Sequence, residues 1–343
     1  KDKFNAYWEG LKKNLNPSVS QAESVEMLAQ HMITKPVFEA LFGNDYFTKE
    51  NPVSKSLEDI VALLDEKSDP EDLEKLERFY NSVKQRAEGI DNAEGKQKVV
   101  VELYDSFFKN AFPMTVEKLG IVYTPVPVVD FILHSTEYVL NKEFGRSISD
   151  EKVNVIDPFT GTGTFITRLL QSGIIKPEDL ERKYKHEIFA NEIVLLAYYI
   201  ASVNIENAYH DLSGKETYEP FGGICLTDTF QLYENGDPTL DDKVFSENSD
   251  RVNEQKRQPI TVVVGNPPYS IGQKSANDNA QNQTYPKLEQ KIADTYVLKS
   301  EANLSKACYD TYIKAFRWAT DRLDANNGGI VAFVTNAGWL KTN

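Results

Sequence analysis

The sequence predicts an α/β fold, a mostly parallel sheet with helices on both faces, preceded by an all-helical domain. From about residue 113 onward, short apolar segments alternate with helical patterns, which is typical of parallel strands joined by crossover helices. Two of these segments, residues 153–156 and 260–264, are continuously apolar, as expected for strands buried on both faces. A glycine-rich turn follows the first of them and leads into a helix.

The first 112 residues carry helical patterns only. Four helices are expected, one after Ser20, one from Leu57 to Leu64 capped by Ser56, one from Asp69-Pro70 to Gly89, and one from Lys98 to Phe112. No cluster of polar side chains accompanies them, so this part predicts a helical module without an activity of its own. Its charge-rich stretch, residues 58–77, reads as a solvated helix face.

The sheet region is expected to contain five strands, namely Val153 to Ile156, Ile188 to Ala190, Gly223 to Leu226, Ile260 to Val264, and Gly329 to Thr335. Helices are expected at Thr164 to Gln171, Ile193 to Ile205, and Asp310 to Leu323. The helix from Ile193 is almost entirely apolar, so it should be buried. The polar stretch Tyr233 to Gln258 reads as an insertion or an exposed loop.

Composition limits the classes of function. The chain has 343 residues, enough for about two domains. A formal net charge of −14 argues against a generally basic nucleic-acid binder, so any DNA contact must be local or come from another part of the protein. No apolar run approaches the roughly 18 residues of a membrane span, so we expect a soluble, cytoplasmic protein. Cys225, Cys308 and the four histidines lack ligand spacing, so reduced thiols and no metal site are expected.

The glycine-rich turn runs from Asp157 to Phe165 with the sequence DPFTGTGTF. Gly161 and Gly163 allow a tight turn and a close ligand approach, and the following helix start offers N–H groups. A dinucleotide fingerprint would need a third glycine at Phe165 or Ile166, which weakens a hydride-transfer interpretation. Asp157 instead suits a cation, such as the ammonium of an amino-acid moiety. A plain strand-to-helix connection is the alternative.

Acidic residues follow the next two strands. Glu192 is placed to take both hydroxyls of a ribose, or else it favours the dipole of the helix that starts there. Asp228 is placed to accept from an adenine amino group, or else it is an N-cap or turn residue. Upstream, Thr124 and Pro125 read as the N-cap and first-turn residue of a helix that points at the glycine-rich turn.

The strand at residues 260–264 leads into Asn266-Pro267-Pro268-Tyr269, at the strand end where α/β enzymes keep their chemistry. The two prolines remove two backbone N–H donors and restrict φ. The Asn266 side-chain oxygen and the bare Pro267 carbonyl then form a pair of acceptors, and Tyr269 supplies a flat face. Together they suit a planar amino group on an aromatic ring.

These motifs together resemble the amino-group methyltransferases that use S-adenosylmethionine, in the gamma arrangement of adenine-specific DNA enzymes. The matching pieces are Tyr123-Thr124-Pro125, Asp157 to Phe165, Glu192, Asp228, Asn266 to Tyr269, and Asn336 to Leu340. The whole chain further resembles the methyltransferase portion, with a preceding helical coupler, of single-polypeptide type ISP restriction-modification enzymes. The resemblance implies a Rossmann-like methyltransferase fold at residues 113–343 and a helical coupler domain at residues 1–112.

The same resemblance implies the roles of individual residues. Asn266, Pro267, Pro268 and Tyr269 would be catalytic. S-adenosylmethionine would be bound by Tyr123, Thr124, Pro125, Asp157, Phe159, Gly161, Gly163, Thr164, Phe165, Glu192, Asp228 and Asn266. The target adenine would be flipped out of double-stranded DNA and stacked on Tyr269, because a base cannot be reached within the duplex. An asparagine at the first loop position favours adenine over cytosine.

The resemblance also implies further domains in the same protein, and alternative functions remain open. Its members carry a nuclease and an ATP-dependent helicase-like translocase in the same polypeptide. Their core sheet has seven strands followed by a target recognition domain, whereas this chain ends after about five, so we expect a truncated part of a longer protein. A protein glutamine methyltransferase with the same loop would suit the acidic charge. Methylation of adenine in RNA and a cofactor-binding module without activity are further alternatives.

Overall fold

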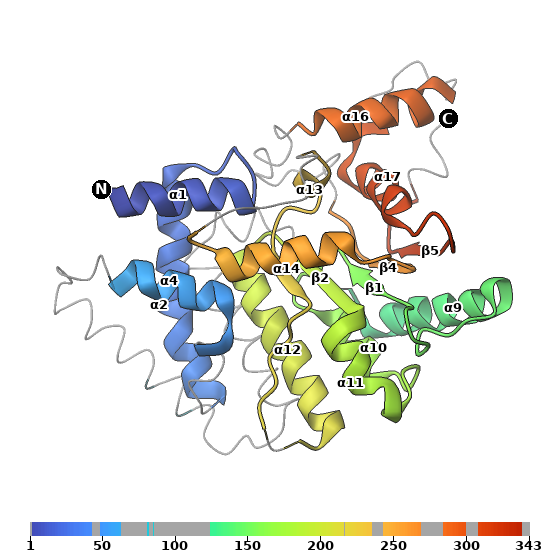
Figure 1. Ribbon diagram of the computed structural model, residues 1–343, viewed down its shortest axis with the longest axis horizontal. Helices are drawn as coiled ribbons and strands as arrows, with labels where there is room; N and C mark the ends of the chain where they lie inside the picture. Colours follow the sequence, from blue (N-terminus) through green and yellow to red (C-terminus); the bar gives the residue numbers. More distant parts are fainter. Residues whose placement is uncertain are drawn as a thin grey trace.

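The computed structural model describes residues 2–42, 49–62, 81, 85, 124–215, 217–234, 243–268, 284–299 and 308–337. Its centre is a sheet of five parallel strands in the order β3-β2-β1-β4-β5 (Figure 1). The strands are β1 (Val155–Asp157), β2 (Ile188–Glu192), β3 (Ile224–Leu226), β4 (Val262–Gly265) and β5 (Ile330–Phe333). The prediction of five parallel strands is confirmed, and each strand begins and ends within two residues of its predicted segment.

Helices precede and connect the strands. The N-terminal helices are α1 (Asp2–Asn14), α2 (Gln21–Phe42) and α4 (Pro52–Ala62). Those of the sheet region are α9 (Val126–Phe144), α10 (Thr164–Gln171), α11 (Leu180–Arg182), α12 (Leu195–Ser213), α13 (Gln231–Glu234), α14 (Ser246–Arg257), α16 (Pro286–Ile292) and α17 (Thr311–Arg322), with short turns η2 (Pro177–Asp179), η3 (Lys183–Glu187) and η4 (Ala293–Val297). The predicted burial of the helix after Glu192 is confirmed by α12.

Different helices cover the two faces of the sheet. Val155 and Val262 belong to a core that also contains residues of α9, α10 and α12, whereas their neighbours Ile156 and Val263 pack with α16 and α17. Successive residues of a strand point to opposite faces, so this alternation separates the two cores. Figure 1 shows α10 and α12 on one side of the strands and α16 and α17 on the other. The predicted α/β fold with helices on both faces is confirmed.

The predicted loop at residues 233–258 is wrong, because α14 occupies part of it. Asn248 Oδ1 accepts from the Leu226 N–H at 2.9 Å, and Asn248 Nδ2 donates to the Leu226 carbonyl at 3.0 Å. The amide thus takes the place of a neighbouring strand at the outer edge of β3. Val252 is the one aliphatic residue of α14, so the helix lacks the apolar stripe that would have indicated it.

Two expected helix starts have different outcomes. Ser20 forms a capping box before α2, since Ser20 Oγ accepts from Glu23 N–H at 3.2 Å and Glu23 Oε2 accepts from Ser20 N–H at 2.8 Å. The predicted cap at Ser56 is wrong because α4 begins one turn earlier. There Asn51 Oδ1 accepts from Val53 N–H at 3.1 Å and so caps the helix. The helices expected at 70–89 and 98–112 lie outside the described residues, apart from 81 and 85.

The N-terminal helices pack directly on the sheet region. Tyr7, Leu11 and Leu57 are fully buried and belong to the same core as α12. Polar contacts add to this, since the buried His31 bonds to Tyr199 of α12 at 2.9 Å through Nδ1. Figure 1 shows α1, α2 and α4 beside α12 and α14. Within the described residues, no helix has the length and apolar composition that a membrane span requires.

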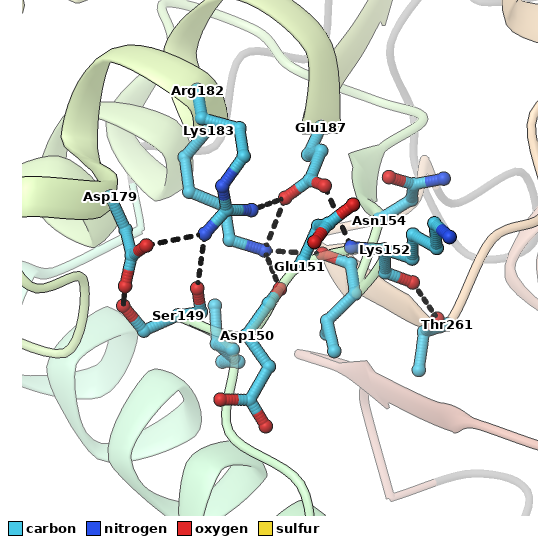
Figure 2. Close-up of polar contacts among 12 residues, drawn as sticks. Ser149, Asp150, Glu151, Lys152, Asn154, Asp179, Arg182, Lys183, Glu187 and Thr261 are labelled. Carbon is cyan, nitrogen blue, oxygen red and sulfur yellow. Dashed lines mark hydrogen bonds and ion pairs between the residues drawn. The ribbon is translucent and has the colours of Figure 1, made fainter.

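A buried charged cluster joins the amino-terminal ends of β1 and β2 (Figure 2). Lys183 Nζ donates to the carbonyls of Asp150 at 2.6 Å and Val153 at 2.9 Å, and pairs with Glu187 at 2.8 Å. Glu187 also pairs with Arg182. Burial lowers the pKa of Lys183, while its acceptors favour the ammonium form. The cluster is structural and lies at the opposite end of the strands from the residues predicted to bind ligands.

Candidate functional site

The predicted site residues gather along one edge of the sheet. Asp157 ends β1, Glu192 ends β2, Asp228 lies two residues after β3, and Asn266 directly follows β4. Because all five strands are parallel, these carboxyl ends share an edge. Strands β1 and β4 flank the point where the strand order reverses, which is where doubly wound sheets bind their ligands.

The glycine-rich turn between β1 and α10 needs both of its glycines. Gly161 and Gly163 have φ of 56° and 86°, in the left-handed region that favours glycine. A Cβ on Gly163 would lie 3.1 Å from the Cα of Ala201 in α12, whereas a Cβ on Gly161 would meet nothing within 4 Å. Asn204 Nδ2 also donates to the Thr162 carbonyl at 2.9 Å. The turn is therefore fixed to α12 at Gly163 and open at Gly161, where a ligand can approach.

We expect Gly163→Ala to destabilise the protein more than Gly161→Ala. The left-handed conformation alone costs about 1–2 kcal/mol for alanine, which applies to both variants. Gly163→Ala adds the close approach to the Ala201 backbone, so its total should be about 2–4 kcal/mol. Urea unfolding of the two variants measures this difference. Equal free energies of unfolding would contradict the close packing of the turn on α12.

Glu192 connects the glycine-rich turn to the start of α12. Its Oε2 accepts from Gly161 N–H at 2.7 Å and its Oε1 accepts from Val194 N–H at 2.8 Å. The predicted role at a helix start is therefore present. A carboxylate accepts about four hydrogen bonds, and the N–H groups of Gly161, Ile193 and Val194 supply three. One position therefore remains for a ligand hydroxyl, and a second hydroxyl would have to replace a backbone donor. Burial raises the pKa of Glu192 to about 7.

Asp157 is a fully buried carboxyl group with few hydrogen bonds. It is 0% exposed, its Oδ1 accepts from Phe159 N–H at 3.1 Å, and its Oδ2 has no hydrogen-bond partner among the described residues. Gly265 makes room for this carboxylate, because a Cβ there would lie 2.6 Å from Asp157 Oδ1. Burial, and secondarily the charge of Glu192, raise the pKa of Asp157 to about 8. A cationic donor beside Oδ2 would supply the missing hydrogen bond and stabilise the ionised form of the carboxyl group.

Asp228 is also buried, and it is surrounded by donors. Its Oδ1 accepts from the N–H groups of Phe230 at 2.9 Å and Gln231 at 3.2 Å, which is the turn role foreseen as the alternative for this residue. Its Oδ2 accepts from the Tyr285 hydroxyl at 2.9 Å. Burial raises the pKa of Asp228, and these donors oppose that effect. Its bond to an adenine amine stays a prediction.

The loop after β4 is anchored at both ends of its Asn-Pro-Pro part. Asn266 Nδ2 donates to Thr124 Oγ1 at 3.1 Å, which fixes the rotation of the amide and hence the direction of its Oδ1. The Thr311 hydroxyl, at the start of α17, donates to the Pro268 carbonyl at 2.7 Å. Pro267 between them is buried. Residues 266–268 are thus tied to Thr124 on one side and to the start of α17 on the other.

The predicted N-cap role of Thr124 is wrong. Helix α9 begins at Val126, the Pro125 carbonyl accepts its first N–H bond from Val128 at 2.9 Å, and Pro127 rather than Pro125 occupies the first turn. The sequence contains two prolines two residues apart, so the helix start was assigned one proline too early. The Thr124 hydroxyl is used instead to hold Asn266.

Other predicted residues differ in how closely they approach this edge. Thr164 begins α10, while the Phe165 side chain lies in the hydrophobic core, so its contribution to a ligand would come from its backbone. The Phe159 ring contacts Phe230 at 5.3 Å and Phe333 at 6.2 Å between centroids, forming an aromatic row beside the strand ends. Tyr123 and Tyr269, and residues 338–340 of the last motif, lie outside the described residues.

Sequence reasoning missed the polar network that holds the strand ends together. Asn191 Nδ2 donates to Thr229 Oγ1 at 3.2 Å, and the Thr229 hydroxyl donates to the Pro158 carbonyl at 2.7 Å. These bonds join the ends of β2, β3 and β1. The signal was Asn191, an amide inside the buried strand β2, where an unpaired polar atom is costly; its Nδ2 is paired, and its Oδ1 has no hydrogen-bond partner among the described residues.

Fold and site together define a doubly wound α/β protein whose candidate site lies at the switch point of the sheet. The model of the type ISP restriction-modification enzyme coupler domain matches residues 1–95, and the model of the N-6 DNA methylase family matches residues 95–307. The chain therefore belongs to the N-6 DNA methylase family, preceded by a type ISP coupler domain. This confirms the resemblance drawn from the motifs. The predicted domain boundary at residue 112 lies outside the described residues and stays a prediction.

Solved structures agree with this assignment. A nuclease-deletion mutant of the type ISP enzyme LlaGI, in complex with a DNA substrate mimic, is 46% identical over 99% of this chain and 27% of its own, with a TM-score of 0.90. The ATP-dependent type ISP enzyme LlaBIII bound to DNA is 47% identical over 98% of this chain and 23% of its own, with a TM-score of 0.90. DrdV, in a complex with DNA, is 36% identical over 99% of this chain and 33% of its own, with a TM-score of 0.88. No curated protein matches the chain.

The chain thus spans between 23% and 33% of the length of these three structures.

Proposed function

We propose that the chain transfers a methyl group from S-adenosylmethionine to the exocyclic amine of adenine in DNA, as the modification part of a cytoplasmic restriction-modification enzyme. The observation that carries the proposal is the anchored Asn266 amide next to the end of β1, where a buried oxygen of Asp157 has no partner among the residues that the structure describes. The family assignment and the likeness to three DNA-bound enzymes support DNA as the substrate.

The residues at the strand ends fit this cofactor. Asp157 Oδ2 would receive the ammonium of the amino-acid moiety, since it is a buried acceptor in need of a cation. Glu192 would accept the ribose hydroxyls, and Asp228 the adenine amine. The open side of Gly161 would let the backbone approach the ligand closely. When bound, S-adenosylmethionine supplies an electrophilic sulfonium methyl group.

The loop after β4 would activate the substrate amine. The lone pair of an adenine amine is delocalised into the ring, so the nitrogen is a poor nucleophile while it stays planar. Asn266 Oδ1 and the Pro267 carbonyl would accept its two N–H groups and draw the nitrogen towards tetrahedral geometry. Positioning of this kind can supply about 7–11 kcal/mol of the barrier. Tyr269 would stack on the flipped base.

The remaining parts of the proposal concern the whole protein. Double-stranded DNA would be the partner, and nuclease and helicase parts would share the polypeptide. Residues 1–112 would act as the coupler and residues 113–343 as the catalytic domain. The common core of α1, α4 and α12 supports a coupler that moves together with the catalytic domain.

Transfer of a labelled methyl group tests the function directly. We expect label from S-adenosylmethionine to appear on adenine-containing duplex DNA. Matched incubations with structured RNA and with a glutamine-containing protein substrate test the two rival methyltransferases. Label on either of those, with none on DNA, would contradict the proposal. Cofactor binding without transfer to any of the three would indicate a binding module.

We expect Glu192→Ala to weaken binding of the cofactor about 10–100-fold. The variant removes the acceptor of two ribose hydroxyls, and hydrogen bonds to a charged group contribute about 1.5–3 kcal/mol. Calorimetry measures the affinity, and Glu178→Ala, an exposed acid in η2, is the matched control that should bind as the wild type does. Unchanged affinity in Glu192→Ala would remove the ribose role.

A further inference from the structure

Among the described residues, four donors bond to the carboxylate of Asp228. Phe230 N–H and Gln231 N–H bond to Oδ1 at 2.9 and 3.2 Å, while the Tyr285 hydroxyl and Asn16 Nδ2 bond to Oδ2 at 2.9 and 3.4 Å. A carboxylate accepts about four hydrogen bonds, so these donors use its capacity. An amine of a ligand can therefore bond to Asp228 only by replacing one of them.

The Asn16 contact is the one that can be replaced. At 3.4 Å it is the longest of the four, and it comes from the segment between α1 and α2, more than 200 residues away in sequence. The two backbone donors belong to the turn that begins α13, so moving them would disrupt the helix start. Asn16 is also held independently of this contact, since its Oδ1 accepts from the Ser18 hydroxyl at 2.6 Å and from the Ser18 N–H at 3.0 Å.

Tyr285, in contrast, is fixed in place. It is 5% exposed and its ring packs edge-on against Phe230, with 5.2 Å between centroids. Lys314 Nζ lies 5.3 Å from the centroid of the same ring and pairs with Glu289 of α16 at 2.6 Å. These contacts leave the Tyr285 hydroxyl one direction, towards Asp228 Oδ2.

We propose that Tyr285 is a positioning residue of the cofactor site, whose hydroxyl holds Asp228 Oδ2 in place while the adenine amine of the cofactor replaces Asn16. The inference rests on the proposed function and extends it to a residue outside the motifs that the chain shares with its family. Tyr285 also connects the residues proposed to bind the cofactor with the loop after β4. Tyr285 precedes α16, and α16 packs on α17, whose Thr311 holds the Pro268 carbonyl.

The test compares two ligands on the full-length protein. S-adenosylhomocysteine carries the adenine amine, and S-inosylhomocysteine carries a carbonyl oxygen in its place, which a carboxylate repels. Calorimetry gives the affinity for each, and their ratio measures recognition of the amine. We expect Tyr285→Phe, which removes only the hydroxyl, to weaken S-adenosylhomocysteine about tenfold and to lower the ratio. Asp228→Ala should lower the ratio furthest.

Asn16→Ala should have the opposite effect. It removes the donor that the amine replaces, so the affinity for S-adenosylhomocysteine should rise by up to about fivefold. Tyr296→Phe and Asn5→Ala are the matched controls and should equal the wild type. A wild-type ratio in Tyr285→Phe, or a loss in Asn16→Ala as large as that in Tyr285→Phe, would overturn the inference. Failure of the wild type to bind S-adenosylhomocysteine would overturn the proposed function itself.

Discussion

Asn266→Ala is expected to lower the rate of methyl transfer about 10²–10³-fold while the affinity for S-adenosylmethionine stays near that of the wild type. The side chain would bond to the reacting amine, so its loss should raise the barrier rather than weaken cofactor binding. The magnitude follows from variants that lose one hydrogen-bonding group aimed at a reacting centre. Single-turnover transfer to duplex DNA and calorimetry with the cofactor measure the two effects separately.

Thr124→Val should lower the rate of methyl transfer less than Asn266→Ala does. It keeps the size of the side chain but removes the acceptor that fixes the Asn266 amide at 3.1 Å. Asn266 then remains present but is less well oriented, so the rate should fall about tenfold rather than 10²–10³-fold. If Asn266→Ala turned over at a near-normal rate, the proposed activation of the amine would be excluded. If Thr124→Val were as slow as Asn266→Ala, Thr124 would need a further role.

The sheet was predictable because its physical signal is local. A strand buried on both faces needs a run of apolar residues, and Val262, Val263 and Val264 meet that need wherever the chain places them. Parallel order then brings the carboxyl ends together, so Asp157, Glu192, Asp228 and Asn266 were expected on one edge without knowledge of their contacts.

Elements stabilised by distant polar contacts were not predictable. Helix α14 is held to β3 by the amide of Asn248, which carries no periodic signal. The end of α1 and the segment after it reach the strand ends: the Asn14 carbonyl accepts from the Thr227 hydroxyl at 3.0 Å, and Asn16 donates to Asp228. Such pairs are over 200 residues apart, so a helical module that looked inert in sequence contacts the candidate site.

The protonation of the carboxyl groups in the site could not be predicted from the sequence either. The position of Asp157 indicated a cation. Its full burial, and an Oδ2 without a partner in the described part of the chain, depend on how Gly265 and the turn after β1 pack around it. These features give Asp157 a pKa of about 8. Since this pKa is raised above the ordinary value, the free protein keeps Asp157 protonated below about pH 8, and the stability that this form contributes is lost as pH rises through that value.

Cofactor binding should therefore release a proton from Asp157. An ammonium at Oδ2 favours the carboxylate, so at pH 7 the complex should hold up to about one proton fewer at this residue than the free protein. The affinity should accordingly rise with pH up to about 8. In Asp157→Asn the rise should end near pH 7, where Glu192 titrates, and the affinity should be about 10–100-fold lower.

Calorimetry in pairs of buffers with different heats of ionisation counts the protons released. The matched ligand is 5′-methylthioadenosine, which keeps adenine and ribose but lacks the ammonium, so it should release no proton from Asp157. The difference between the two ligands should vanish in Asp157→Asn, because the amide has no proton to lose in this range. Equal proton release by both ligands on the wild-type protein would show that the ammonium does not bind at Asp157, and the orientation proposed for the cofactor would then be wrong.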